Sequence, residues 1–186
     1  QGKWRRWGLV GIVAGMATMF FTRPPDIVIA DFGRFVAARA ATGDYHVLGG
    51  NEERIVKSLF SEETGSNLLP WPEPGKPADN LDCAEGGCRY TARGTTVAIV
   101  TDDRGLPASC DGIDAIVSRV PAGFACRKRI PVIDRIDSWR RGAVALWLDL
   151  SRITVTGVND SRGDRPWVPH PVSNTKASET GEETRR

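Results

Sequence analysis

An uncharged, largely apolar segment near the N-terminus is the feature that most restricts what this chain can fold into. Residues 7–22, WGLVGIVAGMATMFFT, contain no charged side chain, whereas three basic side chains precede them and Arg23 follows. As a helix this segment would rise about 24 Å, slightly short of the roughly 30 Å hydrocarbon core of a bilayer. Flanking tryptophans at the interface and snorkelling basic side chains can make up the difference. We therefore expect a transmembrane helix within residues 1–23.

Two other structures fit the same segment, a cleavable signal peptide and a helix buried in a protein core. The basic start and apolar run suit a signal peptide, but no small-x-small cleavage site follows the apolar run before Pro24. Because the basic residues concentrate before the segment, the positive-inside rule places the N-terminus in the cytoplasm and the following domain on the outer side of the membrane. The first residue is Gln1 instead of Met, so we expect further sequence upstream.

Four cysteines follow the apolar segment, at Cys83, Cys88, Cys110 and Cys126. Of the three possible pairings, the sequence-local one, which joins the first two and the last two, is the simplest. A zinc site is the alternative, but one C-x4-C pair followed by widely separated single cysteines does not have the usual ligand spacing. Disulfides persist in oxidising compartments, which agrees with an exported domain.

Short apolar and β-branched runs separated by turn residues predict a β-rich domain over residues 26–160. The first two strands are expected within residues 26–39, on either side of Phe32 and Gly33, and a third at 45–49 completes an antiparallel meander. Further strands are expected at residues 88–92, 97–100, 113–120, 130–134, 143–150 and 152–158.

Between these strands the sequence predicts one helix, one long loop and a disordered tail. Asn51 is a suitable N-cap, and an apolar face follows it over residues 55–60. Residues 61–82 contain four prolines and little periodicity, which predicts a loop across the surface. Residues 161–186 are polar and rich in proline, which is typical of a segment without a packed core.

Common catalytic motifs are absent, including the P-loop, G-x-G-x-x-G, H-E-x-x-H and G-x-S-x-G. His46 alternates with apolar neighbours in a predicted strand, and His170 lies between prolines in the tail. Asp102 and Asp103 follow an apolar strand and are the best candidates for carboxylate chemistry, although a solvated turn is the simpler interpretation. The sequence thus predicts no catalytic residue, no metal site and no cofactor.

A basic segment over residues 119–141 carries seven basic side chains against two acidic ones, with Phe124 and Trp139 interleaved. Cations that follow a phosphate backbone, with aromatic rings that stack on bases, are typical of single-strand nucleic-acid binding. The alternative is a solvated surface in which Trp139 is part of the core and Arg135 pairs with Asp134 or Asp137. The candidate DNA-contact residues are Arg119, Arg127, Lys128, Arg129, Arg135, Arg140 and Arg141.

The order of these motifs resembles the C-terminal region of the ComEC family, the membrane channel for DNA uptake in bacteria. In that family the last hydrophobic helix runs through a proline break into a metallo-β-lactamase-like domain, as in WGLVGIVAGMATMFF followed by RPPDIVIADFGRFVAAR. Asp31 and Gly33 match the D-x-G that ends the family's first strand. VAIVTDD resembles the stretch that ends in a metal-binding aspartate, so Asp102 is the vestigial metal position. Residues 120–123, VPAG, stand where zinc-competent members have a histidine-containing turn.

The H-x-H-x-D-H ligand motif of zinc-competent members is absent, so the resemblance does not extend to their nuclease activity. The four cysteines, VIDRIDSWRRGAVALWL and RGDRPWVP look like the alphaproteobacterial variant, and the resemblance runs to about Val168. It implies an α/β (α+β) fold, in which the last transmembrane helix of a larger membrane domain precedes a degenerate metallo-β-lactamase-like domain.

The function implied is that of a non-catalytic periplasmic domain of the inner-membrane channel for DNA uptake in natural competence. Its partners would be the membrane, incoming DNA, the upstream transmembrane channel domain and further copies of itself in a homo-oligomer. Two alternatives stay open. One is a divergent metal-dependent phosphodiesterase or nuclease that uses Asp102, Asp103 and His46, and the other is a purely structural module held by its disulfides.

Overall fold

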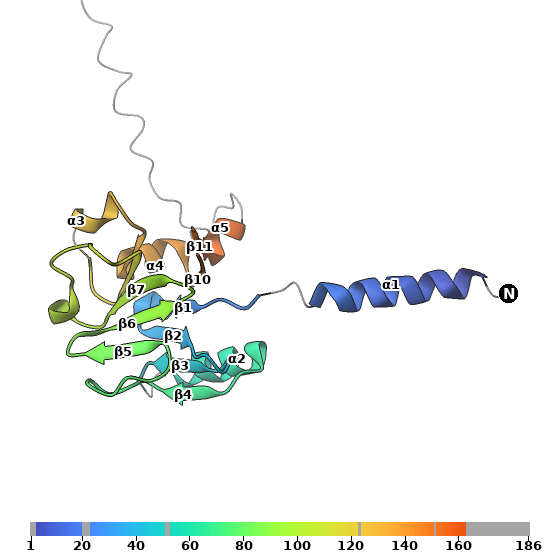
Figure 1. Cartoon of the computed structure of the whole chain (residues 1–186), viewed down its shortest axis with the longest axis horizontal. Coiled ribbons are helices and arrows are strands. Elements are labelled where there is room, and N and C mark those ends of the chain that lie inside the picture. The colour runs from blue at the N-terminus through green and yellow to red at the C-terminus, as the bar shows by residue number, and fades with distance from the viewer. Residues whose placement is uncertain (1–2, 20–22, 51–52, 123, 151, 163–186) are drawn as a thin grey trace, which may run out of the picture.

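Two β-sheets stacked face to face form the body of the protein, and a separate N-terminal helix projects away from them (Figure 1). The computed structural model describes residues 3–19, 23–50, 53–122, 124–150 and 152–162. The predicted tail and His170 lie outside the described residues, apart from the start of the tail at residues 161–162. The predicted α+β class is confirmed.

The first sheet has six strands in the order β11-β10-β1-β2-β3-β4, antiparallel except for the β3–β4 pair. Its strands are β1 (Ile27–Ala30), β2 (Phe35–Arg39), β3 (Tyr45–Leu48), β4 (Leu68–Pro70), β10 (Val144–Asp149) and β11 (Arg152–Gly157). The predicted meander is confirmed as β1-β2-β3.

The second sheet has five strands in the order β5-β6-β7-β8-β9, with β7, β8 and β9 parallel. Its strands are β5 (Leu81–Ala84), β6 (Gly87–Ala92), β7 (Thr95–Val100), β8 (Ala115–Ser118) and β9 (Val132–Ile133). The helices are α1 (Lys3–Met19), α2 (Arg54–Thr64), α3 (Phe124–Arg127), α4 (Arg135–Arg141) and α5 (Val158–Ser161), with 3₁₀ turns η1 (Asp31–Gly33) and η2 (Asp103–Gly105).

The main core lies between the sheets because alternate side chains of each strand point to opposite faces. In β2, Val36 and Ala38 face the second sheet, whereas Phe35 and Ala37 face α2. Phe60 of α2 covers this outer face, with its ring centroid 5.4 Å from Phe35 and 5.0 Å from Tyr45. A third cluster on the outer face of the second sheet is covered by the segments that precede β8 and β9.

The prediction of a loop over residues 61–82 was wrong at both ends and in the middle. Helix α2 continues to Thr64, β4 pairs in parallel with β3, and β5 begins at Leu81. The prolines permit this because Pro70 ends a strand at the edge of its sheet, where a missing N–H removes no ladder hydrogen bond. The helix predicted over residues 55–60 is confirmed, whereas its predicted N-cap, Asn51, lies outside the described residues.

Helix α1 begins before the apolar segment and is 17 residues long. Its apolar side chains, including Leu9 and Ile12, are exposed, and a Cβ built on Gly8, Gly11 or Gly15 would meet no side chain or other segment within 4 Å. Among the described residues, no helix combines the length and the apolar character needed to cross a bilayer.

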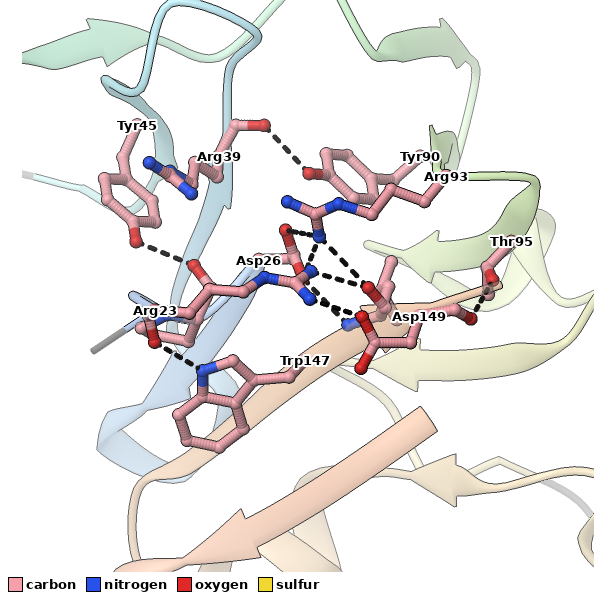
Figure 2. Close-up of polar contacts among 11 residues, drawn as sticks. Arg23, Asp26, Arg39, Tyr45, Tyr90, Arg93, Thr95, Trp147 and Asp149 are labelled. Carbon is pink, nitrogen blue, oxygen red and sulfur yellow. Dashed lines mark hydrogen bonds and ion pairs between the residues drawn. The ribbon is translucent and has the colours of Figure 1, made fainter. Parts of the chain in front are cut away.

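A buried ion-pair network fixes the segment that enters the sandwich (Figure 2). The Asp26 carboxylate, 3% exposed, pairs with Arg23 at 2.8 Å and with Arg93 at 3.1 Å. It also accepts the Leu148 N–H at 2.8 Å, and the indole of Trp147 donates to the Arg23 carbonyl at 2.9 Å. These contacts tie the start of β1 to the end of β10, so the chain enters the sandwich at one fixed point.

Both tyrosines of the chain are buried beside this network and donate to backbone carbonyls (Figure 2). Tyr45 donates to Pro25 at 2.7 Å, and Tyr90 donates to Arg39 at 2.9 Å. Burial, with the nearby negative charge of Asp26, raises the pKa of Tyr90 to about 12. Burial also raises the pKa of Tyr45. Both hydroxyls therefore stay neutral at a higher pH than an exposed tyrosine does.

The structure contains two disulfides, and they are the sequence-local pairs. One joins Cys83 and Cys88, which face each other across β5 and β6, and the Trp71 indole donates to the sulfur of Cys88 at 3.2 Å. The other joins Cys110, in the loop before β8, to Cys126 in α3. This second bridge fastens the two connections that cover the outer face of the second sheet.

Candidate functional site

A cleft of about 560 Å³ opens where β1, β7 and β8 end. Each of these strands is followed at once by residues that line it, and α4 closes one side. The lining residues are Phe32, Gly33, Arg34, Thr101, Arg119 and Arg135. Three arginines that are far apart in sequence therefore meet at one end of the sandwich.

The turn at the end of β1 brings the walls of the cleft together. Asp31, Phe32 and Gly33 have φ values of +49°, +55° and +83°, three successive residues in the left-handed region. Gly33 is packed so closely that a Cβ on it would lie 3.6 Å from the Cα of Arg119 and 3.8 Å from the Cα of Arg135. The left-handed turn thus places the β1 end against both the β8 end and the start of α4.

The three arginines have different surroundings. Arg119 is held by the cleft wall, since its Nε–H donates to the Gly33 carbonyl at 3.1 Å. Arg34 pairs with Asp31 at 3.0 Å. Within the part of the chain that the structure describes, the exposed Arg135 side chain has no hydrogen-bond or ion-pair partner. The described lining of the cleft therefore carries three guanidinium groups and no carboxylate, and Arg34 is paired with Asp31 of the adjoining turn.

Asp134, next to Arg135 in sequence, is the buried hub that positions this wall. Its carboxylate, 2% exposed, caps α4 by accepting the Ile136 and Asp137 N–H groups at 2.8 and 3.0 Å. It also accepts the Ala122 N–H at 3.2 Å and pairs with Arg127. Burial works against the charged form, but the Asp137 N–H and the Arg127 guanidinium outweigh it and lower the pKa of Asp134. One carboxylate therefore joins α3, α4 and the segment after Arg119.

An apolar half adjoins the cationic one. A second hollow of about 410 Å³ is lined by Phe32, Pro121, Arg135, Ile136 and Trp139. Phe32 and Arg135 line both hollows, so the two adjoin, and we name them the cationic half and the apolar half of one cleft. Trp139 is 58% exposed, and it shares a face of α4 with Arg135 because the two are four residues apart.

The cleft contains only two of the seven DNA-contact candidates, Arg119 and Arg135. Arg127 is used internally, where it pairs with Asp134 and Asp137, and Arg141 pairs with Asp160. The remaining candidates are exposed and line neither half of the cleft; they are Lys128, Arg129 and Arg140.

The alternative of a plain solvated surface was wrong in two particulars. The acidic residues of the segment pair with Arg127 and not with Arg135, because Asp134 points inward to cap α4. Trp139 is exposed and is not part of the core. The guanidinium of Arg135 and the indole ring of Trp139 are therefore both exposed to solvent in one cleft.

The carboxylate and histidine candidates have structural contacts instead. Asp102 caps η2 by accepting the Arg104 N–H at 2.9 Å, and Asp103 is exposed in the same turn. His46 lies in β3 of the other sheet, with Nδ1 2.8 Å from the Pro70 carbonyl oxygen. Over the described residues there is no cluster of three or more histidine, cysteine or carboxylate side chains that could hold a metal ion.

Sequence reasoning missed Arg34 and Phe32 as members of the site. Both belong to the turn after the first strand, and only the D-x-G spacing singled out that region. Their distance in sequence from Arg119 and Arg135 hides the cluster, which forms only when β1, β8 and α4 come together.

Chemically, the cleft can bind an anion beside a flat or apolar group. Guanidinium groups form bidentate hydrogen bonds with phosphate or carboxylate oxygens, and an exposed indole ring offers a stacking surface. Comparisons of the chain with protein-family models, with curated proteins and with solved structures find no match.

Proposed function

We propose that this chain is a non-catalytic module that contacts DNA through its cationic cleft. The observation that carries the proposal is the meeting of Arg34, Arg119 and Arg135 in one cleft whose rim is aromatic. Phosphate contacts by arginine supply most of the affinity of proteins that bind nucleic acid without reading its sequence. A cleft of this kind suits a flexible strand whose phosphates and bases are both accessible.

We propose further that the module belongs to a DNA-uptake channel of the ComEC type. In this arrangement the apolar segment at residues 7–22 is the last helix of a larger membrane domain, and the sandwich is a degenerate metallo-β-lactamase-like domain in the periplasm. The proposal is supported by the D-x-G turn after β1, by the two disulfides, which suit an oxidising compartment, and by the topology of the entry point. The chain enters at the start of β1, and the cleft lies at the opposite end of this strand.

The number of phosphate contacts sets the salt dependence that such a cleft should show. For single-stranded DNA the logarithm of the affinity falls by about 0.7 per contact for each tenfold rise in salt. Three contacts therefore predict a loss of affinity of roughly 20-fold between about 50 and 200 mM salt, and one contact predicts a loss of about 2.6-fold. The difference is large enough to measure with one labelled oligonucleotide.

The test is fluorescence anisotropy of a labelled single-stranded oligonucleotide with the full chain and with the double variant Arg119→Gln, Arg135→Gln. The variant should bind more weakly and should lose most of the salt dependence. The matched control is Arg54→Gln with Arg152→Gln, which removes two exposed arginines that do not line the cleft. The proposal is wrong if the chain does not bind the oligonucleotide, or if the control pair lowers affinity as much as the cleft pair.

A further inference from the structure

We propose that the cleft accommodates one nucleotide unit, with its phosphate in the cationic half and its base in the apolar half. This inference rests on the proposed function and deepens it, because it assigns the two halves to different parts of the ligand. The shared chemistry is that of a 5′-nucleotide, either free or within a strand.

The two halves differ in what they can bind. The cationic half is lined by Arg34, Arg119 and the hydroxyl-bearing Thr101, which together offer donors to an anion. The apolar half is lined by Pro121, Ile136 and Trp139. An inorganic anion would leave the apolar half empty, and a purely apolar ligand would cover the guanidinium groups without giving them an acceptor. A ligand that combines a phosphate with a planar ring satisfies both halves.

Phe32 and Arg135 hold the two halves together because they line both. Arg135 thus reaches either the phosphate or the edge of the base. Trp139 follows on the same face of α4, so the cation and the indole ring are presented side by side on one rigid element. The Asp134 cap fixes where this element begins, and it thereby fixes the spacing of the two halves.

Phe32 carries an independent signal of a binding role. Its φ of +55° is uncommon for a residue with a bulky side chain, and the residue is 49% exposed instead of buried. Strained backbone of this kind persists only where the surrounding structure holds it, and it is often found at ligand sites. Core packing does not explain an exposed ring, whereas a surface for a base does.

The experiment is competition against the labelled oligonucleotide by dAMP, by deoxyadenosine and by inorganic phosphate. Stacking on an aromatic ring strengthens binding by roughly fivefold to 150-fold per base. The nucleotide should therefore compete at a concentration at least about fivefold below that of phosphate, and the nucleoside should compete poorly. In Trp139→Leu the advantage of dAMP over phosphate should disappear while phosphate competes as before. Leu150→Ala, which removes an exposed apolar side chain outside the cleft, should leave the advantage intact.

The outcomes separate this inference from the proposed function. Oligonucleotide binding with equal competition by dAMP and phosphate overturns the two-part site and leaves DNA contact standing. The same conclusion follows if Trp139→Leu keeps the full preference for dAMP. No binding of the oligonucleotide at all overturns both proposals. Trp139 is exposed, so the variant removes few core contacts, and circular dichroism verifies that it is folded.

Discussion

Replacing Asp134 with asparagine should destabilise the domain strongly, because one buried carboxylate satisfies donors from three segments. Asparagine keeps one oxygen that can cap α4. Its N–H₂ group would then face the Ala122 N–H and the Arg127 guanidinium, which are both donors and would lose their acceptor. Breaking a buried ion pair costs about 3–5 kcal/mol. Arg127 keeps Asp137 at 2.9 Å and is 27% exposed, so we expect a loss near the lower end, about 3 kcal/mol.

Urea denaturation at neutral pH, followed by circular dichroism, measures this change. The matched control is Asp111→Asn, an exposed carboxylate bonded to the neighbouring Ser109, which should change stability by less than about 0.5 kcal/mol. Folding lowers the pKa of Asp134. Its charged carboxylate therefore stabilises the folded state at pH values above the ordinary pKa of 3.8, and this stabilisation is lost as the pH falls through the pKa of the folded state. The cost of the substitution should therefore shrink in acid below pH 3.8. A loss under about 1 kcal/mol at neutral pH would refute the hub role.

Two further predictions concern the network where the chain enters the sandwich. Asp26→Asn should lower the free energy of unfolding, measured by urea titration, by about 3 kcal/mol. Glu73→Gln, which breaks an exposed ion pair, should change it by less than about 0.5 kcal/mol. Losses of equal size in the two variants would contradict the argument that burial makes the Asp26 pairs strong. In an ultraviolet titration of the folded protein, Tyr45 should be less than half ionised at pH 10.0, the ordinary pKa, and Tyr90 should ionise only at about pH 12. The raised pKa of Tyr90 stabilises the folded state below pH 10.0, and this contribution is lost as the pH rises through about 12. Half-ionisation at pH 10.0 in the folded protein would show that the hydroxyls are exposed.

Local signals were enough to predict most strands of the sandwich. The turn at Arg93 and Gly94 has φ values of +52° and +77°, as a two-residue hairpin turn requires, and glycine supplies one of them. The sequence-local cysteine pairing could also be predicted, because Cys83 and Cys88 are close in sequence. In the structure they face each other on either side of a hairpin turn. These features depend on neighbours in sequence, which a single sequence displays.

The cleft could not be predicted because it depends on contacts between distant segments. α4 has only seven residues, too few for an amphipathic pattern to mark it as a helix. Arg127 turns inward because it pairs with the buried Asp134, whereas Arg135 lines the cleft. The sequence composition does not distinguish these two arginines. The parallel pairing of β4 with β3 is likewise a long-range contact, formed across α2.

Photocrosslinking of a single-stranded oligonucleotide to the full chain, with the attached peptides identified by mass spectrometry, tests DNA contact at the cleft most directly. We predict that the crosslinks concentrate at Phe32 and Trp139, and that free dAMP suppresses them before inorganic phosphate does. Crosslinks confined to the far end of the sandwich, around Leu150 and Arg152, would contradict the account, as would an equal yield from the Arg119→Gln, Arg135→Gln variant.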